Sequence, residues 1–487
     1  MNDDSSIVRL AASIRETAAR MRPGDRLPSS RELVRTHGVS PVTVSRALGR
    51  LAAEGRVIIR PGSGTYVAPA VPRPDDAADL SWQTVALGDR VVDDAAVSGL
   101  LTPPPEGVVP LTGGYLPAAL LPERALSAAA SRAARRPGVW ETPPLNGLAE
   151  LRGWFAREAG GGVTAADVLV AAGGQAALTH AFRALAAPGT AVLVETPTYP
   201  GALAAARAAG LRATAVPVDR DGVRPELLAE AFAVTGARIF YCQPTLHNPT
   251  GATLPPDRRH QVLAIARAAG AFVVEDDYAR YLTTSPAPPP LVALDPHGTV
   301  VHVNSLTKPL SAGMRVAGVV ARGPAALRLR ASQVVESFFV PRLLQETALE
   351  LVGSPAWPRH LAALGAELAA RRTALVTELT VHLPAVDVHL VPRGGLHLWL
   401  RLPPGTGEDA VVEAARRAGV TVSPGRVYHP AEPPGPRIRV THSAAAHVAE
   451  LSEGVRRLAA ALGVPPEYGR NGPRGEIAAG QPPVSAP

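Results

Sequence analysis

The sequence predicts two globular parts, a small helical unit that ends in a β-hairpin and a large α/β body. With 487 residues the chain is long enough for two or more domains, and its 46% of apolar residues indicates a folded protein. In the larger part, short apolar runs at 168–170, 191–194 and 271–274 are separated by alanine-rich stretches of helical length. This alternation is typical of an α/β domain with a mostly parallel sheet.

Composition sets the expected domain boundaries. Residues 69–80 are rich in proline, alanine and acid, as a linker is, and we expect the segment after them to dock on the body through Trp82. The last residues are polar and rich in proline and glycine, which predicts disorder. The predicted divisions are a small domain at 1–68, a linker and docking segment at 69–109, the body at 110–463 and a tail at 464–487.

The small domain carries the start and stop signals of three helices. Apolar residues between 7 and 18 recur at helical spacing, and Ser29 with Glu32 forms a capping box that opens a second helix. Ser40 is a good N-cap for a third helix, which Gly55 can end in a left-handed conformation. A β-hairpin is expected over 56–67. A helix, a helix-turn-helix and a hairpin together make a winged helix.

Most of the chain's positive charge lies in this domain. Residues 1–68 contain eleven arginines and six acidic residues, which gives +5 of the total of +7. A basic head on a near-neutral body indicates a polyanion such as DNA, although any single arginine is equally well a solvated surface charge. The third helix of a winged helix lies in the major groove, whereas other elements hold phosphate. The expected base contacts are Thr43, Ser45 and Arg46, and the expected phosphate contacts are Arg31, Arg60 and Ser63.

The remaining composition favours a cytoplasmic protein. The single cysteine, Cys242, cannot form an intrachain disulfide, which fits a reducing compartment. The first 30 residues carry charges throughout and lack the apolar core of a signal peptide. No apolar run reaches the length of a membrane span, which is about 18 residues. We also expect no metal site.

Lys308 is the single lysine of a chain that otherwise uses arginine. An amine can lose its proton and attack a carbonyl, whereas a guanidinium stays protonated. The position therefore indicates chemistry that arginine cannot perform. An accidental surface lysine is the alternative, and the motif Ser305-Leu306-Thr307-Lys308 argues against it.

Three sequence blocks of the head carry a family resemblance. Residues 23–33, 39–48 and 60–67 resemble, in order and spacing, the GntR family of winged-helix regulators. The resemblance covers the whole head and implies that it binds double-stranded DNA.

The body, from about 110 to 463, resembles the fold-type I, class I/II aminotransferases. The Ser305-x-x-Lys308 block, the Asn-Pro-x-Gly block at 248–251 and the C-terminal block at 437–440 appear in the family's order. The resemblance implies an α/β fold-type I transferase domain with a small C-terminal α+β subdomain. It also implies the cofactor pyridoxal phosphate (PLP), held as an aldimine on Lys308.

The resemblance assigns roles to further residues of the body. Tyr199 would stack on the pyridine ring, with a structural tyrosine as the alternative, and Asn248 and Tyr278 would bind the phenolic oxygen. Arg439 would hold a substrate carboxylate with its two-pronged guanidinium. The remaining residues would bind the phosphate: Gly174, Gln175, Ser305, Thr307 and Arg315.

Two neighbouring acids compete for the pyridine nitrogen. The usual Asp-to-Tyr spacing of true aminotransferases is three residues, which would select Glu275. Regulator-type relatives have the shorter spacing, so we assign Asp276. A carboxylate there keeps the nitrogen protonated and makes the ring an electron sink.

A GntR-type head joined to an aminotransferase-like body resembles the MocR/GabR family of transcription regulators. The resemblance implies a head-to-tail homodimer whose body senses a small amino compound, or PLP itself, through the aldimine at Lys308. A working aminotransferase with a DNA-binding head is the second interpretation, and a body that serves only as a scaffold for dimerisation is the third. One departure from the family is Trp140, because many relatives have a tyrosine in this region that reaches the partner subunit's phosphate.

Overall fold

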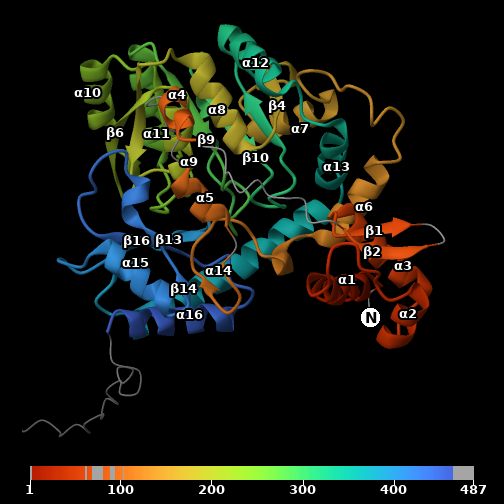
Figure 1. Cartoon of the computed structure of the whole chain (residues 1–487). Coiled ribbons are helices and arrows are strands. Elements are labelled where there is room, and N and C mark those ends of the chain that lie inside the picture. The colour runs from red at the N-terminus through yellow and green to blue at the C-terminus, as the bar shows by residue number, and fades with distance from the viewer. Residues whose placement is uncertain (1–2, 61–62, 69–79, 88–93, 103, 464–487) are drawn as a thin grey trace, which may run out of the picture. The chain divides into compact units, whose positions relative to one another are not determined.

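The computed structural model of the chain describes residues 3–60, 63–68, 80–87, 94–102 and 104–463. Its Cα positions divide the chain into two compact units, Met1–Arg90 and Val91–Pro487 (Figure 1). Most of the predicted linker, the hairpin residues 61–62 and the predicted tail lie outside the described residues. The domain boundaries drawn from composition therefore stay predictions.

The first unit contains the expected elements of a winged helix. Apolar side chains from all three helices and both strands form one buried core. A further short helix, α4 (Trp82–Leu87), follows them. The expected docking of this segment on the body through Trp82 stays a prediction. The winged-helix elements are α1 (Asp3–Ala19), α2 (Ser30–His37), α3 (Pro41–Ala53) and the antiparallel pair β1 (Val57–Arg60) and β2 (Gly64–Val67).

Local side chains fix the helix ends in this unit. The Ser29 amide donates to the Glu32 carboxylate at 2.8 Å, and the Glu32 amide donates back to the Ser29 hydroxyl at 3.3 Å. The Ser40 hydroxyl accepts a hydrogen bond from the Thr43 amide at 3.1 Å. Gly55 follows α3 with a φ of +67°. The predicted capping box, N-cap and left-handed helix end are confirmed.

The second unit is built on an eight-stranded sheet. The central strand pairs are parallel, whereas β11 and the short β7 run antiparallel to their neighbours, so the predicted mostly parallel sheet is confirmed. Across the sheet the strands are β4 (Val168–Ala171), β11 (Ala317–Val320), β10 (Val300–Ser305), β9 (Phe272–Asp276), β8 (Ile239–Cys242), β5 (Ala191–Thr196), β6 (Arg212–Asp219) and β7 (Gly222–Val223).

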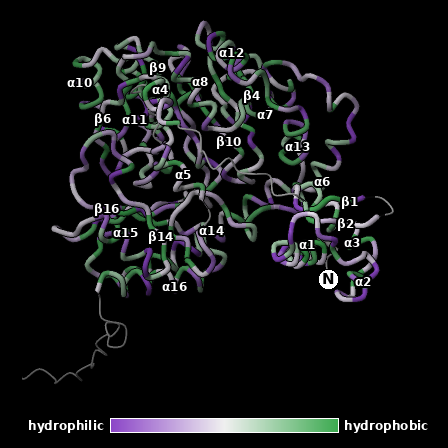
Figure 2. The backbone as a smooth tube through the Cα atoms, in the orientation of Figure 1, coloured by the Kyte–Doolittle hydropathy of each residue, from purple (hydrophilic) through white to green (hydrophobic). Residues whose placement is uncertain are grey.

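Helices cover both faces of this sheet and form two separate hydrophobic cores. In Figure 2 these helices alternate between green and purple along their length, as amphipathic helices do. One core is built with α7 (Ala149–Ala159), α10 (Pro225–Thr235), α11 (Pro256–Ala268) and α13 (Arg342–Val352), and packs with α6 (Glu123–Ala133). The other is built with α8 (Gly174–Leu185), α9 (Pro200–Ala208) and α12 (Gly323–Ser337).

A smaller subdomain follows the large sheet. The 27-residue helix α14 (Ala356–His382) leads into a four-stranded antiparallel sheet that buries its own core. This is the expected small C-terminal α+β part. Its strands are β12 (Asp387–Val388), β13 (His397–Arg401), β16 (Arg437–Thr441) and β15 (Ser423–Pro424), and its helices are α15 (Glu408–Arg417) and α16 (Val448–Ala461).

The start of the body is joined to this C-terminal subdomain. Strand β3 (Val109–Pro110) pairs in parallel with β14 (Val420–Thr421), and the Thr441 amide donates to the carbonyl of Leu111 at 2.9 Å. The segment before β3 holds the helix α5 (Ala95–Leu101), which lies against α9. Among the described helices none is both long and apolar enough to cross a membrane.

Close packing beneath the sheet predicts a strong effect of one methyl group. A Cβ atom on Gly318 of β11 would lie 2.4 Å from the Phe155 ring, so we expect Gly318→Ala to lower the free energy of unfolding by about 1–3 kcal/mol. Gly153→Ala in α7 is the control, because its Cβ would approach no atom closer than 3.6 Å and should stabilise the helix by about 0.5–1 kcal/mol. Chemical denaturation of the two variants measures both changes, and equal stabilities would contradict the packing described here.

Candidate functional site

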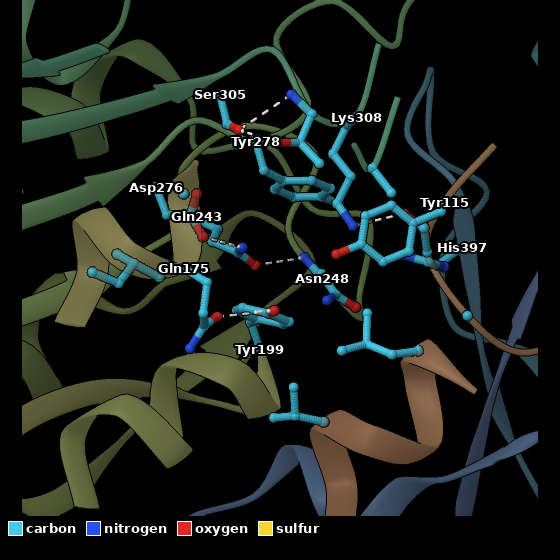
Figure 3. Close-up of a pocket in the computed structure, with 18 of the residues that line it drawn as sticks. Tyr115, Gln175, Tyr199, Gln243, Asn248, Asp276, Tyr278, Ser305, Lys308 and His397 are labelled. Carbon is cyan, nitrogen blue, oxygen red and sulfur yellow. Dashed lines mark hydrogen bonds between the residues drawn. The ribbon is translucent and has the colours of Figure 1, made fainter. Parts of the chain in front are cut away.

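A cavity of about 320 Å³ lies at the edge of the large sheet where its parallel strands end. Asp276 is the last residue of β9, Ser305 is the last of β10, and Gln243 directly follows β8. Because parallel strands end at the same edge, residues far apart in the sequence meet there. Figure 3 shows their side chains pointing into the cavity.

The cavity gathers every residue that the sequence predicted for the cofactor and the substrate. Their presence in one pocket is a finding, whereas their individual roles stay predictions. The lining includes Gly174, Gln175, Tyr199, Asn248, Asp276, Tyr278, Ser305, Thr307, Lys308, Arg315 and Arg439.

Lys308 reaches into the cavity from the turn after β10. Its Nζ donates to the carbonyl oxygen of Gly114 at 2.6 Å and lies 3.8 Å from the centroid of the Tyr115 ring. Burial, together with the positive charges of Arg439 and Arg315, lowers the pKa of Lys308 to about 7, although Asp276 opposes the shift. A large fraction of this amine is therefore neutral and nucleophilic at neutral pH.

Asp276 is the acid that faces the cavity. Its Oδ2 accepts hydrogen bonds from Tyr241 Oη and from Gln243 Nε2, both at 2.8 Å. Burial raises the pKa of Asp276, and these two hydrogen bonds act in the opposite direction. The carboxylate is thus held in a fixed orientation at the inner end of the pocket.

The acids on either side of Asp276 serve the scaffold. Glu275 accepts from the backbone amides of Leu291 and Val292, at the start of the short helix η3 (Leu291–Leu294). Asp277 lies between His302 and Arg280, which hold its pKa below the usual value against the effect of burial. Alternation along the strand thus leaves Asp276, and neither neighbour, in the cavity.

One end of the cavity is rich in anion-binding groups. Helix α8 begins at Gly174, and a Cβ on the preceding Gly173 would lie 2.8 Å from the Arg315 guanidinium. Arg315 donates to the carbonyl of Ala172 at 2.9 Å, and the Ser305 and Thr307 hydroxyls lie 3.1 Å apart. A helix N-terminus, a guanidinium and two hydroxyls form a cradle suited to a phosphate.

Arg439 forms a second anion-binding point. It is 1% exposed, and its Nη1 donates to Asn248 Oδ1 at 3.1 Å and lies 3.3 Å from His397 Nε2. Its Nη2 donates to the carbonyl of Gly113 at 2.5 Å, while its buried Nε has no partner among the described residues. A buried guanidinium with spare donor capacity suits a carboxylate ligand.

Two tyrosines border the same cavity. Tyr199 Oη donates to Gln175 Oε1 at 3.1 Å, and Tyr278 Oη donates to the carbonyl of Leu246 at 2.7 Å. Burial raises the pKa of both phenols, so both stay protonated. The Tyr278 hydrogen bond must be exchanged before this hydroxyl can donate to a phenolic oxygen.

In the first unit, the predicted DNA contacts divide into two groups. Arg31, Ser45, Arg46, Arg60 and Ser63 are exposed, as contact with DNA requires. The wing residues are organised by one tyrosine, Tyr66, whose ring lies 5.0 Å from the Arg60 guanidinium and whose hydroxyl lies 2.9 Å from that of Ser63.

Thr43 differs from the prediction. Its side chain is 4% exposed, and its hydroxyl lies 2.8 Å from that of Ser40. The reason is helical periodicity, because Thr43 shares the inner face of α3 with Val44 and Ala47. Thr43 closes the first turn of the helix and is not placed to read a base.

Comparisons with known proteins match both units. Residues 8–67 match the gntR family of bacterial regulatory proteins, and residues 109–458 match the class I and II aminotransferases. The HTH-type transcriptional regulator YdcR of Escherichia coli is 30% identical, over 87% of this chain and 92% of its own. TauR, an HTH-type transcriptional regulator of Rhodobacter capsulatus, is 29% identical over 91% of this chain and 93% of its own. The chain belongs to the MocR-type transcriptional regulators.

The body of this MocR-type regulator is also similar to solved aminotransferases. LysN, the α-aminoadipate aminotransferase of Thermus thermophilus, was solved with N-(5'-phosphopyridoxyl)-L-leucine; it is 28% identical with a TM-score of 0.73, over 79% of this chain and 98% of its own. An archaeal alanine:glyoxylate aminotransferase is 26% identical with a TM-score of 0.70. The match covers 76% of this chain and 95% of the aminotransferase. The family and the phosphopyridoxyl neighbour indicate PLP as the cofactor.

The cavity of the regulator fits this cofactor. The cradle around Arg315 matches the phosphate, Asp276 is an oriented acceptor for a protonated ring nitrogen, and Lys308 is an amine beside both. The unpartnered Nε of Arg439 leaves a donor for an acidic group of a further ligand. Among the described residues no cluster of metal-binding side chains is found.

Several lining residues of the regulator were missed at the level of sequence. Gly113, Gly114 and Tyr115 follow β3, and their role is to hold the two cations Lys308 and Arg439. His397 begins β13 beside Arg439, and burial with that charge keeps its pKa well below the usual value, so the ring is neutral. The glycine pair before an aromatic residue was the available signal for the first group. His397 gave no comparable signal, because it meets Arg439 only through the pairing of β13 with β16.

The lowered pKa of Lys308 predicts how its reactivity depends on pH. In protein freed of PLP, acetylation of this amine should rise with a midpoint near pH 7, because the neutral form predominates above its pKa. Arg439→Gln should move the midpoint upward, since it removes a charge that disfavours the ammonium form. Mass spectrometry can follow Lys308 beside the N-terminal amine, an internal reference that the variant should leave unchanged. A midpoint near the ordinary 10.5 would contradict the described environment.

Proposed function

We propose that this protein is a transcription regulator whose body binds PLP at Lys308 and senses there a small amino compound, or PLP itself, to change how the head binds DNA. The observation that carries the proposal is the position of the chain's single lysine. It lies in a cavity between an anion cradle and a buried arginine, and the same chain carries a winged helix.

The residues of the cavity divide between cofactor and ligand. Gly174, Gln175, Ser305, Thr307 and Arg315 hold the phosphate in this proposal. Around the ring, Asp276 binds the pyridine nitrogen, Asn248 and Tyr278 bind the phenolic oxygen, and Tyr199 stacks. When bound, PLP supplies an electrophilic carbonyl and an electron-withdrawing ring.

The chain's own contacts define how a ligand would be received. Lys308 Nζ must leave the Gly114 carbonyl to act as a nucleophile, and its low pKa means that no strong base is needed. Arg439 would exchange the Gly113 carbonyl for the ligand's carboxylate, which is a charge-assisted and therefore stronger hydrogen bond. Both exchanges act on the same short segment after β3. A ligand changes the state of the protein only through such differential contacts.

A working aminotransferase is the second candidate. The observation in its favour is that the cavity holds an amine, a ring-nitrogen acceptor and a carboxylate receptor together. The 2-aminoadipate transaminase of Thermus thermophilus is 29% identical over 73% of this chain and 90% of its own. Steady formation of a new amino acid from an amino acid and a keto acid would distinguish this function from sensing.

We propose a cytoplasmic, head-to-tail homodimer, so that two heads bind two half-sites. Large exposed apolar side chains on the body support an interface of this kind. Trp140 is 78% exposed and Phe338 is 68% exposed. Trp140 would take the region from which many relatives reach the partner's phosphate.

Loss of Lys308 tests the sensing function. Full-length protein with PLP and a set of amino acids should show at least a tenfold change in affinity for a DNA duplex selected from random sequence, measured by fluorescence anisotropy. Lys308→Ala should bind the duplex, because its head is intact, but show neither the change nor the visible absorbance of lysine-bound PLP. Arg417→Ala, an exposed position, is the control. An unchanged response in Lys308→Ala would refute the proposal.

The head offers a second test, because base contacts and phosphate contacts behave differently. Arg46→Ala should reduce the free energy of binding to the selected duplex by about 1–3 kcal/mol, as loss of a bidentate base contact does. Its effect on binding to a scrambled duplex should be small. Arg60→Ala should weaken binding to both duplexes alike. It should also reduce the salt dependence of the binding constant by about one released ion. Anisotropy titrations at several salt concentrations separate the two patterns, and identical behaviour of the variants would show that the assignment is wrong.

A further inference from the structure

Helix α5 adds an apolar wall to the ligand cavity. It carries Val97 and Leu101 into the lining, and it lies against α9, whose first turn begins directly after Tyr199. Leu101 is 55% exposed, so its side chain is only partly covered by the protein itself. In Figure 3 this helix, drawn in brown, lies at the edge of the cavity. The segment was expected to dock on the body, and it also shapes the site.

The charges of the cavity are already assigned. Among the described lining residues three are basic: Lys308 would react with the cofactor's aldehyde, Arg315 would face its phosphate and Arg439 would face a ligand carboxylate. The one acidic residue, Asp276, faces the ring nitrogen and is held by Tyr241 and Gln243. A ligand side chain with a second charge would therefore be buried without a counter-charge, which is costly.

Two glutamines of the lining are already engaged within the protein. Gln175 accepts from Tyr199 and donates to the carbonyl of Gly201 at 2.8 Å. Gln243 donates to Asp276 and accepts from the Asn248 amide at 3.1 Å. Both amides make hydrogen bonds inside the protein, and the wall that α5 adds to the cavity is apolar.

We propose that the effector is an α-amino acid with an apolar side chain, and that Val97 and Leu101 of α5 select it. This inference rests on the proposed function, since it names the class of compound sensed at that same site. Removing apolar surface from water favours such a ligand by about 25 cal/mol for each Å² buried. An ω-amino acid has the same two end groups but no side chain, so it would leave the wall on α5 without a contact.

The position of α5 in the chain gives this selection a further meaning. The helix follows the head and its linker and precedes the body's first strand, β3. A side chain that packs on Val97 and Leu101 therefore holds the segment through which the two units are joined. Ligands that lack the side chain would occupy the cavity without fixing this helix.

The test compares four probes on the full-length protein with PLP: L-leucine, L-glutamate, L-arginine and β-alanine. Calorimetry measures binding, and anisotropy with the selected duplex measures the response of the head. We expect leucine to bind at least tenfold more tightly than each of the others and to cause the largest change in DNA affinity.

Leu101→Arg supplies the decisive variant, because it places a cation on the wall without disturbing a buried core. It should lower the ratio of leucine to glutamate affinity at least tenfold. Leu327→Arg, on an exposed face of α12 where the side chain is 68% exposed, is the matched control and should leave that ratio unchanged.

The outcomes separate the two levels of the proposal. The apolar class is overturned, while sensing stands, if glutamate, arginine or β-alanine binds as tightly as leucine. The same holds if the ratio of leucine to glutamate affinity is equal in Leu101→Arg and Leu327→Arg. If no probe binds and none changes DNA affinity, the apolar class is overturned as well, while the Lys308→Ala comparison decides the sensing function by itself.

Discussion

The structure of the body depends on three ionisable groups that are kept largely out of water in one cavity. Asp276, Lys308 and Arg439 are drawn from three distant parts of the chain, and burial shifts the pKa of each toward its neutral form. Such groups cost free energy unless other groups complete their hydrogen bonds. The protein does this only in part, with backbone carbonyls and neutral side chains. The cavity is therefore suited to a ligand whose own polar groups complete the hydrogen bonds of these three residues.

The fold supplies the rigidity that this arrangement needs. Parallel strands end together and present Gln243, Asp276 and Ser305 side by side, while the small subdomain contributes Arg439 from β16. Helices on both faces bury the sheet from water, so the strand ends have little freedom. The segment after β3 closes the set by binding both Lys308 and Arg439 through successive carbonyls. Cofactor chemistry and ligand recognition thus share one short loop.

Much of this could be predicted from the sequence, because the signals were local. Capping residues fixed the helix ends, and the family resemblance placed its motif residues in one cavity. Contacts between distant segments could not be predicted in this way: 194 residues separate Lys308 from its acceptor Gly114, and no spacing reports that pair. The packing of α5 beside the cavity is equally non-local. Thr43 is the opposite case, since its burial follows from the helical period that it shares with Val44 and Ala47, which is a local signal.

The pairing of β3 with β14 has a mechanical consequence. The first strand of the body pairs with a strand of its C-terminal subdomain, so the two ends of the body are held together. A rotation of the small subdomain would therefore carry β3 with it. Within the body, the first strand and the C-terminal subdomain therefore move as one piece.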